Sequence, residues 1–198
     1  MRIFVHMPKC AGISVMHAIE KYRGLNDTQW QINADFLNSV QDRDELLSLY
    51  KREPTLVVGN PIIMGHIFPV RYVNPSNIDE NFRLVTILRE PLQRLISHYA
   101  FFKASTFNGN YLWEQFKLQG GSFEEFAFSP EMRNVYSTYT SGIDLDLFTY
   151  IGTYEDLGVS TKTCLDLLGI LYPDNFILPL ENKNNLKVKV DVSSTLEK

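Results

Sequence analysis

The segment from residue 83 to residue 88 constrains the fold of this chain most. Its sequence, RLVTIL, is almost continuously apolar and rich in β-branched residues. A strand with one face in water alternates apolar and polar residues, whereas a continuous apolar run is typical of a parallel strand covered on both faces. Pro91 follows closely and suits the first turn of a helix, and apolar residues then recur at helical spacing as far as Phe102. The sequence therefore predicts a buried parallel strand that leads directly into a helix.

The same order of elements recurs along the chain. Residues 2–6 (RIFVH) predict a strand, followed by a turn with Pro and Gly and then a helix over about residues 14–22. Further strands are expected at residues 55–58, 150–154 and 176–178, and further helices at residues 35–51 with Asp35 as cap, 111–118, 122–128 with Ser122 as N-cap and Glu125 three residues on, 131–139 and 157–171. Alternating strands and helices predict an α/β fold with three α/β/α layers and a central, mainly parallel sheet.

Length and charge set the organisation of the chain and exclude some partners. With 198 residues, 44% of them hydrophobic, the chain has enough apolar side chains for one core, and we predict a single domain over residues 1–198 whose tail after about residue 180 is irregular or truncated. The 23 acidic and 19 basic residues give a formal net charge of −4. Because no overall positive field would attract nucleic acid, any anion site must be local.

No segment approaches the roughly 18 to 20 apolar residues that a membrane span needs, and no signal-peptide core follows the N-terminus. We therefore expect no membrane span and a soluble, cytoplasmic protein. Cys10 and Cys164 are the only cysteines and lie far apart in sequence, so both are expected to be free thiols.

The connection from the first strand to the first helix, HMPKCAGISV at residues 6–15, has the composition of an anion-binding loop. Backbone amides at a helix N-terminus carry positive partial charge. Lys9 adds a full charge, Gly12 permits close backbone approach, and Ser14 offers a hydroxyl. Taken singly, Lys9 could equally be an exposed lysine on a turn and Ser14 a simple helix cap.

The loop resembles a phosphate loop but lacks the nucleotide-kinase pattern G-x-x-x-x-G-K-S/T. The strongest predicted strand ends in Arg89, where a magnesium-dependent site would carry an aspartate. The fold class expected is therefore P-loop-like, with a different phosphate loop and no required metal.

Arg89 and Ser97 form a second candidate group. Arg89 stands where the strand of residues 83–88 ends, and Ser97 lies eight residues later on the following helix. A guanidinium can bind a phosphate in bidentate fashion, and a hydroxyl can donate one more hydrogen bond. Arg94 and His98 have different helical angles and are left out of the site, with Arg94 expected as a surface cation or ion-pair partner.

Together the two segments resemble motifs of the carbohydrate-type sulfotransferase superfamily. HMPKCAGIS is similar to the loop H-x-P-K-T/C-A/G-G-T/S-S, and REPLQRLISHY is similar to R-D/E-P-x-x-R-x-x-S-x-Y/F. In that family the loop binds the 5′-phosphosulfate of 3′-phosphoadenosine 5′-phosphosulfate (PAPS), and the arginine and serine bind its 3′-phosphate. The resemblance assigns PAPS binding to a loop and two later residues: Pro8, Lys9, Cys10, Ala11, Gly12, Ile13, Ser14, Arg89 and Ser97.

The resemblance extends to YIGTYEDL at residues 150–157 and covers roughly residues 1–180. Ile13 stands where the family usually has a hydroxyl residue, and Cys10 stands where it often has threonine. A weaker match, RNVYSTYTSG at residues 133–142, carries Tyr136 and Thr138 where relatives often have glutamine and arginine. Nucleotide contact from this helix is therefore not expected.

His66 is the candidate general base among the four histidines. It follows Gly65 in MGHIFP, which resembles the segment that carries the catalytic histidine in glycan O-sulfotransferases of this superfamily. A neutral imidazole with a pKa near 6.5 can accept a hydroxyl proton near neutral pH. The alternative is a loop histidine with a structural hydrogen bond. Lys9 is the second candidate catalytic residue, offsetting charge on the leaving oxygen.

The function predicted is sulfuryl transfer from PAPS to an acceptor hydroxyl, on a carbohydrate or small molecule, with PAP as product. Two alternatives stay open. One is a P-loop nucleotide phosphotransferase, which magnesium dependence would support. The other is a non-catalytic module that binds nucleotides or sulfated glycans, which PAPS binding without turnover would support.

Overall fold

The computed structural model describes residues 1–22, 30–32, 40–59, 61–74, 77–104, 116, 118 and 121–178, with only the backbone described at residues 30–32 and 40–42. The expected cap Asp35, the residues after 178 and nearly all of the expected helix at 111–118 lie outside these ranges.

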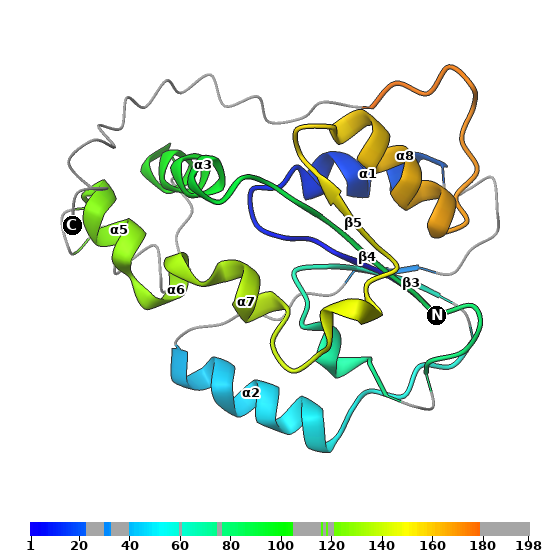
Figure 1. The fold of residues 1–198 in the computed structure, drawn as a ribbon, viewed down its shortest axis with the longest axis horizontal. Helices are drawn as coiled ribbons and strands as arrows, with labels where there is room; N and C mark the ends of the chain where they lie inside the picture. The colour runs from blue at the N-terminus through cyan, green and yellow to red at the C-terminus, as the bar shows by residue number, and fades with distance from the viewer. Residues whose placement is uncertain are drawn as a thin grey trace.

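A five-stranded parallel sheet forms the centre of the molecule (Figure 1). The strands are β1 (Arg2–Val5), β2 (Trp30–Ile32), β3 (Ile62–Gly65), β4 (Arg83–Leu88) and β5 (Tyr150–Thr153), in the order β2-β3-β1-β4-β5. Each neighbouring pair is parallel. The prediction of an α/β fold with a mainly parallel sheet is confirmed, and the described sheet is parallel throughout.

Helices cover both faces of this sheet. The described α-helices are α1 (Gly12–Tyr22), α2 (Val40–Arg52), α3 (Pro91–Ala104), α5 (Phe123–Phe128), α6 (Pro130–Arg133), α7 (Val135–Tyr139) and α8 (Leu157–Leu167), with short 3₁₀ turns η2 (Pro69–Arg71) and η3 (Leu145–Leu147). In Figure 1, α1 and α8 lie on one side of the sheet, and α2 and α7 lie on the other.

The alternation of side chains along the strands divides the core between these two layers. Phe4 and Val85 face α1 and α8, where they pack with Val15, Ile19 and Leu165. Neighbouring strand residues point the opposite way and meet another set of apolar side chains: Ile3, Val5, Ile63 and Leu84 pack with Cys10, Tyr72, Phe148 and Tyr136. Both faces are therefore buried, as the apolar run of residues 83–88 predicts.

A third cluster, largely aromatic, lies beside the sheet where α3 meets α5 and α6. Tyr99, Phe102, Phe116 and Phe126 pack there. Ser122 caps α5 by accepting from the Glu125 amide, and the Glu125 carboxylate accepts from the Ser122 amide, so the predicted capping box is confirmed.

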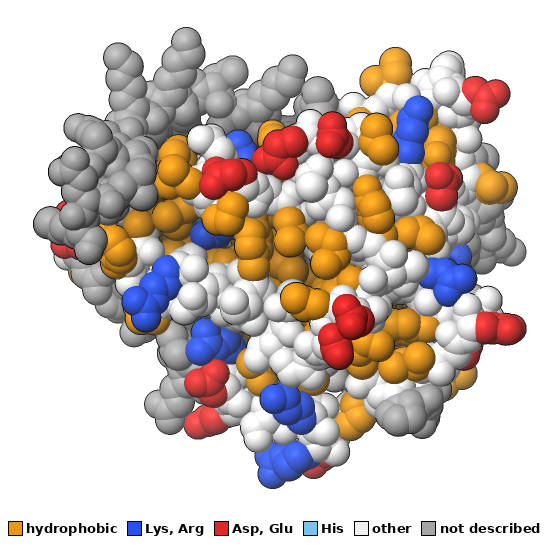
Figure 2. Space-filling model, in the orientation of Figure 1, with side chains coloured by type: hydrophobic (Ala, Val, Ile, Leu, Met, Phe, Trp, Pro, Cys, Tyr) orange, Lys and Arg blue, Asp and Glu red, His pale blue; other side chains and the backbone are white. Residues whose placement is uncertain are grey.

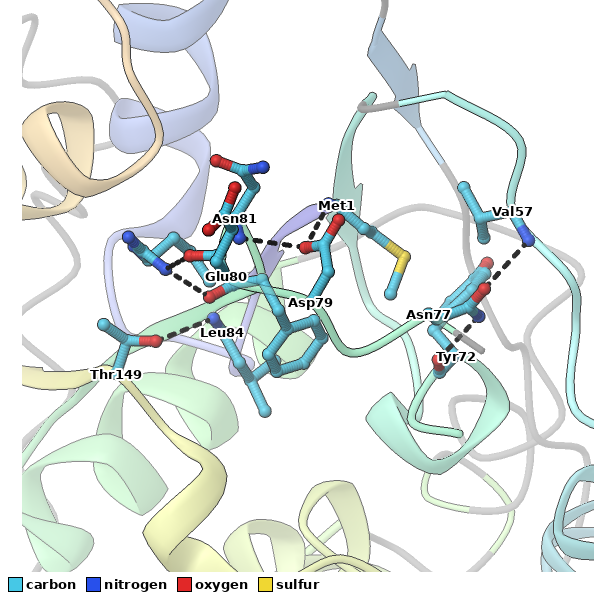
Figure 3. Close-up of polar contacts among 11 residues, drawn as sticks. Met1, Val57, Tyr72, Asn77, Asp79, Glu80, Asn81, Leu84 and Thr149 are labelled. Carbon is cyan, nitrogen blue, oxygen red and sulfur yellow. Dashed lines mark hydrogen bonds and ion pairs between the residues drawn. The ribbon is translucent and has the colours of Figure 1, made fainter. Parts of the chain in front are cut away.

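The predicted strand at residues 55–58 is wrong, and the strand is β3 instead. Leu56 is 69% exposed and Val58 is 85% exposed. The buried side chain of Asn77 binds this segment: its oxygen accepts from Val57 N at 3.2 Å (Figure 3). Its amide donates to Thr55 O at 2.8 Å. Because these side-chain bonds take the place of a sheet partner, the segment stays outside the sheet.

Other predicted boundaries also change. Residues 176–178 form no strand: Ile177 is 80% exposed, and Phe176 packs against Tyr22 and Tyr172. The predicted helix at 131–139 divides at Asn134 into α6 and α7. The predicted helix at 157–171 ends earlier, at Leu167.

The surface in Figure 2 has a band of hydrophobic side chains across the middle of the face in view, with charged groups mainly above and below it. Lys and Arg side chains of the described residues in this view are interspersed with acidic ones and form no continuous basic surface on this face. Within the described ranges, no helix combines the length and hydropathy of a membrane span.

Candidate functional site

The candidate site lies at the carboxyl ends of the strands, beside β1. This strand pairs with β3 on one side and with β4 on the other. The chain thus reaches one side of β1 first and then crosses to the other side. In open parallel sheets, ligands bind outside the carboxyl ends of the strands at such a switch point. His6, His66 and Arg89 each directly follow a strand that ends there.

The loop from β1 to α1 has an uncommon backbone conformation. Lys9 and Ala11 have φ angles of 66° and 59°, in the left-handed region that residues with a Cβ rarely adopt. Such conformations cost free energy and cluster at ligand sites. From the sequence, Gly12 was expected to permit close backbone approach, and the left-handed backbone of Lys9 and Ala11 was not predicted. Pro8 and Ala11 are both partly exposed, and α1 begins directly after the loop.

Gly12 makes room for a neighbouring side chain. A Cβ built at Gly12 would lie 1.7 Å from Cδ2 of His6. The space that the sequence analysis left for a ligand beside Gly12 is therefore taken by the His6 ring. His6 in turn stacks on His66, with ring centroids 4.1 Å apart. The loop glycine thus fixes the first of two stacked imidazoles.

Lys9 and Arg89 place two partly exposed cations at this edge. Lys9 Nζ lies 4.3 Å from the centre of the Phe101 ring, and Arg89 Cζ lies 4.3 Å from that of Tyr154. Burial and the positive charge of Arg89 lower the pKa of Lys9. Among the described residues neither cation forms an ion pair with a carboxylate. An aromatic face holds a cation without neutralising it, so both charges remain available to an anion.

One hydroxyl group joins the loop to the arginine. Tyr136 Oη donates to Arg89 O at 2.5 Å, accepts from Arg89 N at 3.1 Å and lies 3.5 Å from Cys10 Sγ. Burial raises the pKa of the Cys10 thiol, which disfavours a role for Cys10 as a nucleophile. The position of Tyr136 was not predicted, because no nucleotide contact was expected from residues 133–142.

His66 has the hydrogen bonding of a neutral base. Its Nδ1 lies 2.7 Å from the carbonyl oxygen of His6. Because a carbonyl only accepts, Nδ1 must carry the proton, and the neutral ring then has its lone pair on Nε2. Burial is the main cause that lowers the pKa of His66, so the ring is neutral at pH 7. Nε2 makes no hydrogen bond to any described residue.

The hydroxyl side chains of Ser14 and Ser97 differ in accessibility. Ser14 is 3% exposed, inside the first turn of α1, and Ile13 beside it is 43% exposed. Ser97 is partly exposed on α3, and no hydrogen bond joins it to another predicted site residue in the described part of the chain.

The expectation that Arg94 lies on the surface is wrong. Arg94 is 4% exposed, and its guanidinium donates to Met132 O at 2.9 Å and contacts His98 Nδ1 at 3.2 Å. The reason is that α6 and the aromatic cluster cover the face of α3 that carries Arg94 and His98. Burial and the nearby charge of Arg94 lower the pKa of His98 well below its usual range.

The structure thus brings Lys9, Cys10, His66 and Arg89 to one edge, from three separate parts of the sequence. No group of three or more His, Cys, Asp or Glu residues suitable for a metal ion occurs among the described residues. The arrangement supplies two cations, an unusual loop backbone and a neutral imidazole.

Comparisons with known proteins give only distant similarity. No protein-family model matches the chain, and no curated protein matches it. A mouse sulfotransferase, SULT7A1, solved in complex with PAP, is 19% identical with a TM-score of 0.41, over 87% of this chain and 59% of that one. A sulfotransferase from Alicyclobacillus acidocaldarius is 14% identical with a TM-score of 0.43, over 98% and 89%. The chain thus spans 59% of the mouse structure.

Proposed function

We propose that this protein is a sulfotransferase that moves a sulfuryl group from PAPS to an acceptor hydroxyl. The observation that carries the proposal is the pair of cations at the switch point, Lys9 and Arg89: each contacts an aromatic ring, and neither forms an ion pair with a carboxylate of the described residues. These are the residues to which the two sequence motifs assign the 5′-phosphosulfate and the 3′-phosphate.

The residues of the candidate site fit a ligand with two separate anionic groups. The loop from β1 to α1 would bind the phosphosulfate through Lys9 and its backbone amides. Arg89 and the hydroxyl of Ser97 would bind the 3′-phosphate. Cys10 and the backbone of Arg89 contact the same Tyr136 oxygen, so the two segments are near neighbours, as binding of one nucleotide requires.

His66 would act as the general base. Its Nε2 would accept the proton of the acceptor hydroxyl as the acceptor oxygen bonds to sulfur. The bond from sulfur to the bridging oxygen breaks, and that oxygen leaves on PAP with the electron pair. Lys9 would offset the charge that develops on this oxygen. The acceptor we favour is a sugar hydroxyl, on the resemblance of the His66 segment to glycan O-sulfotransferases.

A turnover assay tests this proposal. PAP formation from PAPS is measured by mass spectrometry over a panel of oligosaccharides and small alcohols or phenols. We expect acceptor-dependent PAP and a sulfated product from at least one carbohydrate, and a rate lowered by about a hundredfold or more in His66→Ala.

Two other outcomes would contradict the proposal. Tight PAPS binding without product over the whole panel would favour a non-catalytic binding module. Magnesium-dependent phosphate transfer from ATP would favour a nucleotide phosphotransferase.

A further inference from the structure

We propose that Tyr136 is a positioning residue that sets the affinity of this site for the 3′-phosphate of the nucleotide. The inference rests on the proposed function, because it assigns Arg89 to that phosphate. Tyr136 stands where the sulfotransferase motif often carries a glutamine.

The contacts of the hydroxyl lead to this assignment. Tyr136 Oη binds both the amide and the carbonyl of Arg89, at 3.1 Å and 2.5 Å. The same oxygen lies 3.5 Å from Cys10 Sγ in the loop after β1. Arg89 has just left β4 and has not yet entered α3, so its backbone groups lack partners within either element. Tyr136 therefore supplies the bonds that fix the backbone at this point.

The ring of Tyr136 is itself fixed. It packs in the core layer with Cys10 and Leu88, and the buried guanidinium of Arg94 lies 5.7 Å from its centre. The hydroxyl of Thr140, the residue that follows α7, donates to Tyr136 O at 3.1 Å. The hydroxyl thus projects from a packed ring on a helix, and rigid elements of this kind position site residues well.

The chemistry of a phenol suits this position. Lys9 and Arg89 are close enough for the charge of Arg89 to lower the pKa of Lys9. A carboxylate between the loop and Arg89 would bind them together but would also neutralise the site. Burial raises the pKa of Tyr136, so its hydroxyl stays uncharged and joins the two segments without opposing an anionic ligand.

The test compares PAP with AMP, which lacks the 3′-phosphate, by calorimetric titration of wild type and Tyr136→Phe. Phenylalanine keeps the ring and removes the hydroxyl that binds the Arg89 amide and carbonyl. We expect PAP affinity to fall about tenfold and AMP affinity to change less than about twofold. An equal loss for both nucleotides would assign Tyr136 a general structural role and overturn the inference, as would unchanged PAP affinity.

Tyr99→Phe is the matched control. Tyr99 also donates from a buried hydroxyl to a backbone carbonyl, that of Gly121 at 2.8 Å, but it lies in the aromatic cluster beside α5. We expect it to leave the ratio of PAP to AMP affinity unchanged. A fall equal to that of Tyr136→Phe would contradict the inference.

A double-mutant cycle tests whether Tyr136 acts through Arg89. In an Arg89→Ala background, Tyr136→Phe is expected to have no further effect on PAP affinity; a full tenfold loss there would overturn the inference. If Tyr136→Phe does not fold, Tyr136→Gln and Tyr136→Met are compared in its place. Tyr136→Gln, which keeps a donor and an acceptor, must then have a higher ratio of PAP to AMP affinity than Tyr136→Met. Equal PAP and AMP affinity in wild type would instead remove the proposed function itself.

Discussion

At the scale of single residues, the site combines two cations that form no ion pair with a described carboxylate and an imidazole that is neutral at pH 7. Lys9 and Arg89 contact aromatic rings, and the Nδ1 proton of His66 is directed to the His6 carbonyl. These features depend on tertiary contacts between residues that lie far apart in the sequence. The residue types were predicted from the sequence, whereas Phe101, Tyr154 and the His6 carbonyl as their partners were not.

The pH dependence of turnover tests the part of His66. Because burial lowers its pKa below 6.5, the base form predominates at pH 7 and is lost as the pH falls below 6.5. We expect kcat/KM to be level around pH 7 and to decline on the acid side through one protonation, measured with a carbohydrate acceptor identified in the panel. A decline that begins above pH 7 would contradict this assignment.

At the scale of elements, the unit formed by β1, its loop and α1 depends on close packing between His6 and Gly12. The His6 ring occupies the position of a Gly12 side chain and stacks on His66 at the end of β3. A substitution at Gly12 that moves the His6 ring would therefore also disturb His66, which directly follows β3.

Gly12→Ala is expected to lower the free energy of unfolding by about 1–3 kcal/mol, because the added methyl must displace His6. Urea denaturation measures this. Gly158→Ala in α8 is the control: its added Cβ would meet nothing within 4 Å, so we expect a gain of up to about 1 kcal/mol. Equal effects at both positions would contradict this account of the loop.

The elements also show what the sequence could predict. The sequence correctly predicted β4, α3 and the capping box of α5, because each has a local signal. These signals are the continuous apolar run of β4, Pro91 at the start of α3 and the Ser122–Glu125 pair. Residues 55–58 have the same β-branched composition, yet Asn77, twenty residues away from Val57, binds them outside the sheet. The signal for β3 was the apolar run after Pro61, all of which is buried. The contact of Tyr136 with Arg89 depends on tertiary packing and has no local signal.

At the scale of the whole molecule, buried histidines link stability to pH. Burial is the main cause that lowers the pKa values of His6 and His98 well below 6.5. The unfolded chain therefore binds protons below pH 6.5 that the folded chain does not. The free energy of unfolding therefore decreases as the pH falls below about 6.5. The contribution of these two histidines is complete only above that pH.

We expect the free energy of unfolding to fall by more than about 1 kcal/mol between pH 7 and pH 5, measured by urea denaturation at each pH. His98→Gln removes one of the two groups while keeping an acceptor for Arg94, so its slope should be smaller. A slope that is unchanged in this variant would show that other groups are responsible.

We propose that Lys9 and Arg89 form one site for a nucleotide with a 3′-phosphate. Calorimetric titration with PAP, on wild type and Arg89→Ala and with AMP and ATP as controls, is the decisive experiment. We predict micromolar PAP binding, much weaker AMP binding, and loss of the difference in Arg89→Ala, because the guanidinium supplies the bidentate contact. Equal affinity for PAP and AMP in wild type, or no binding of either, would contradict the claim.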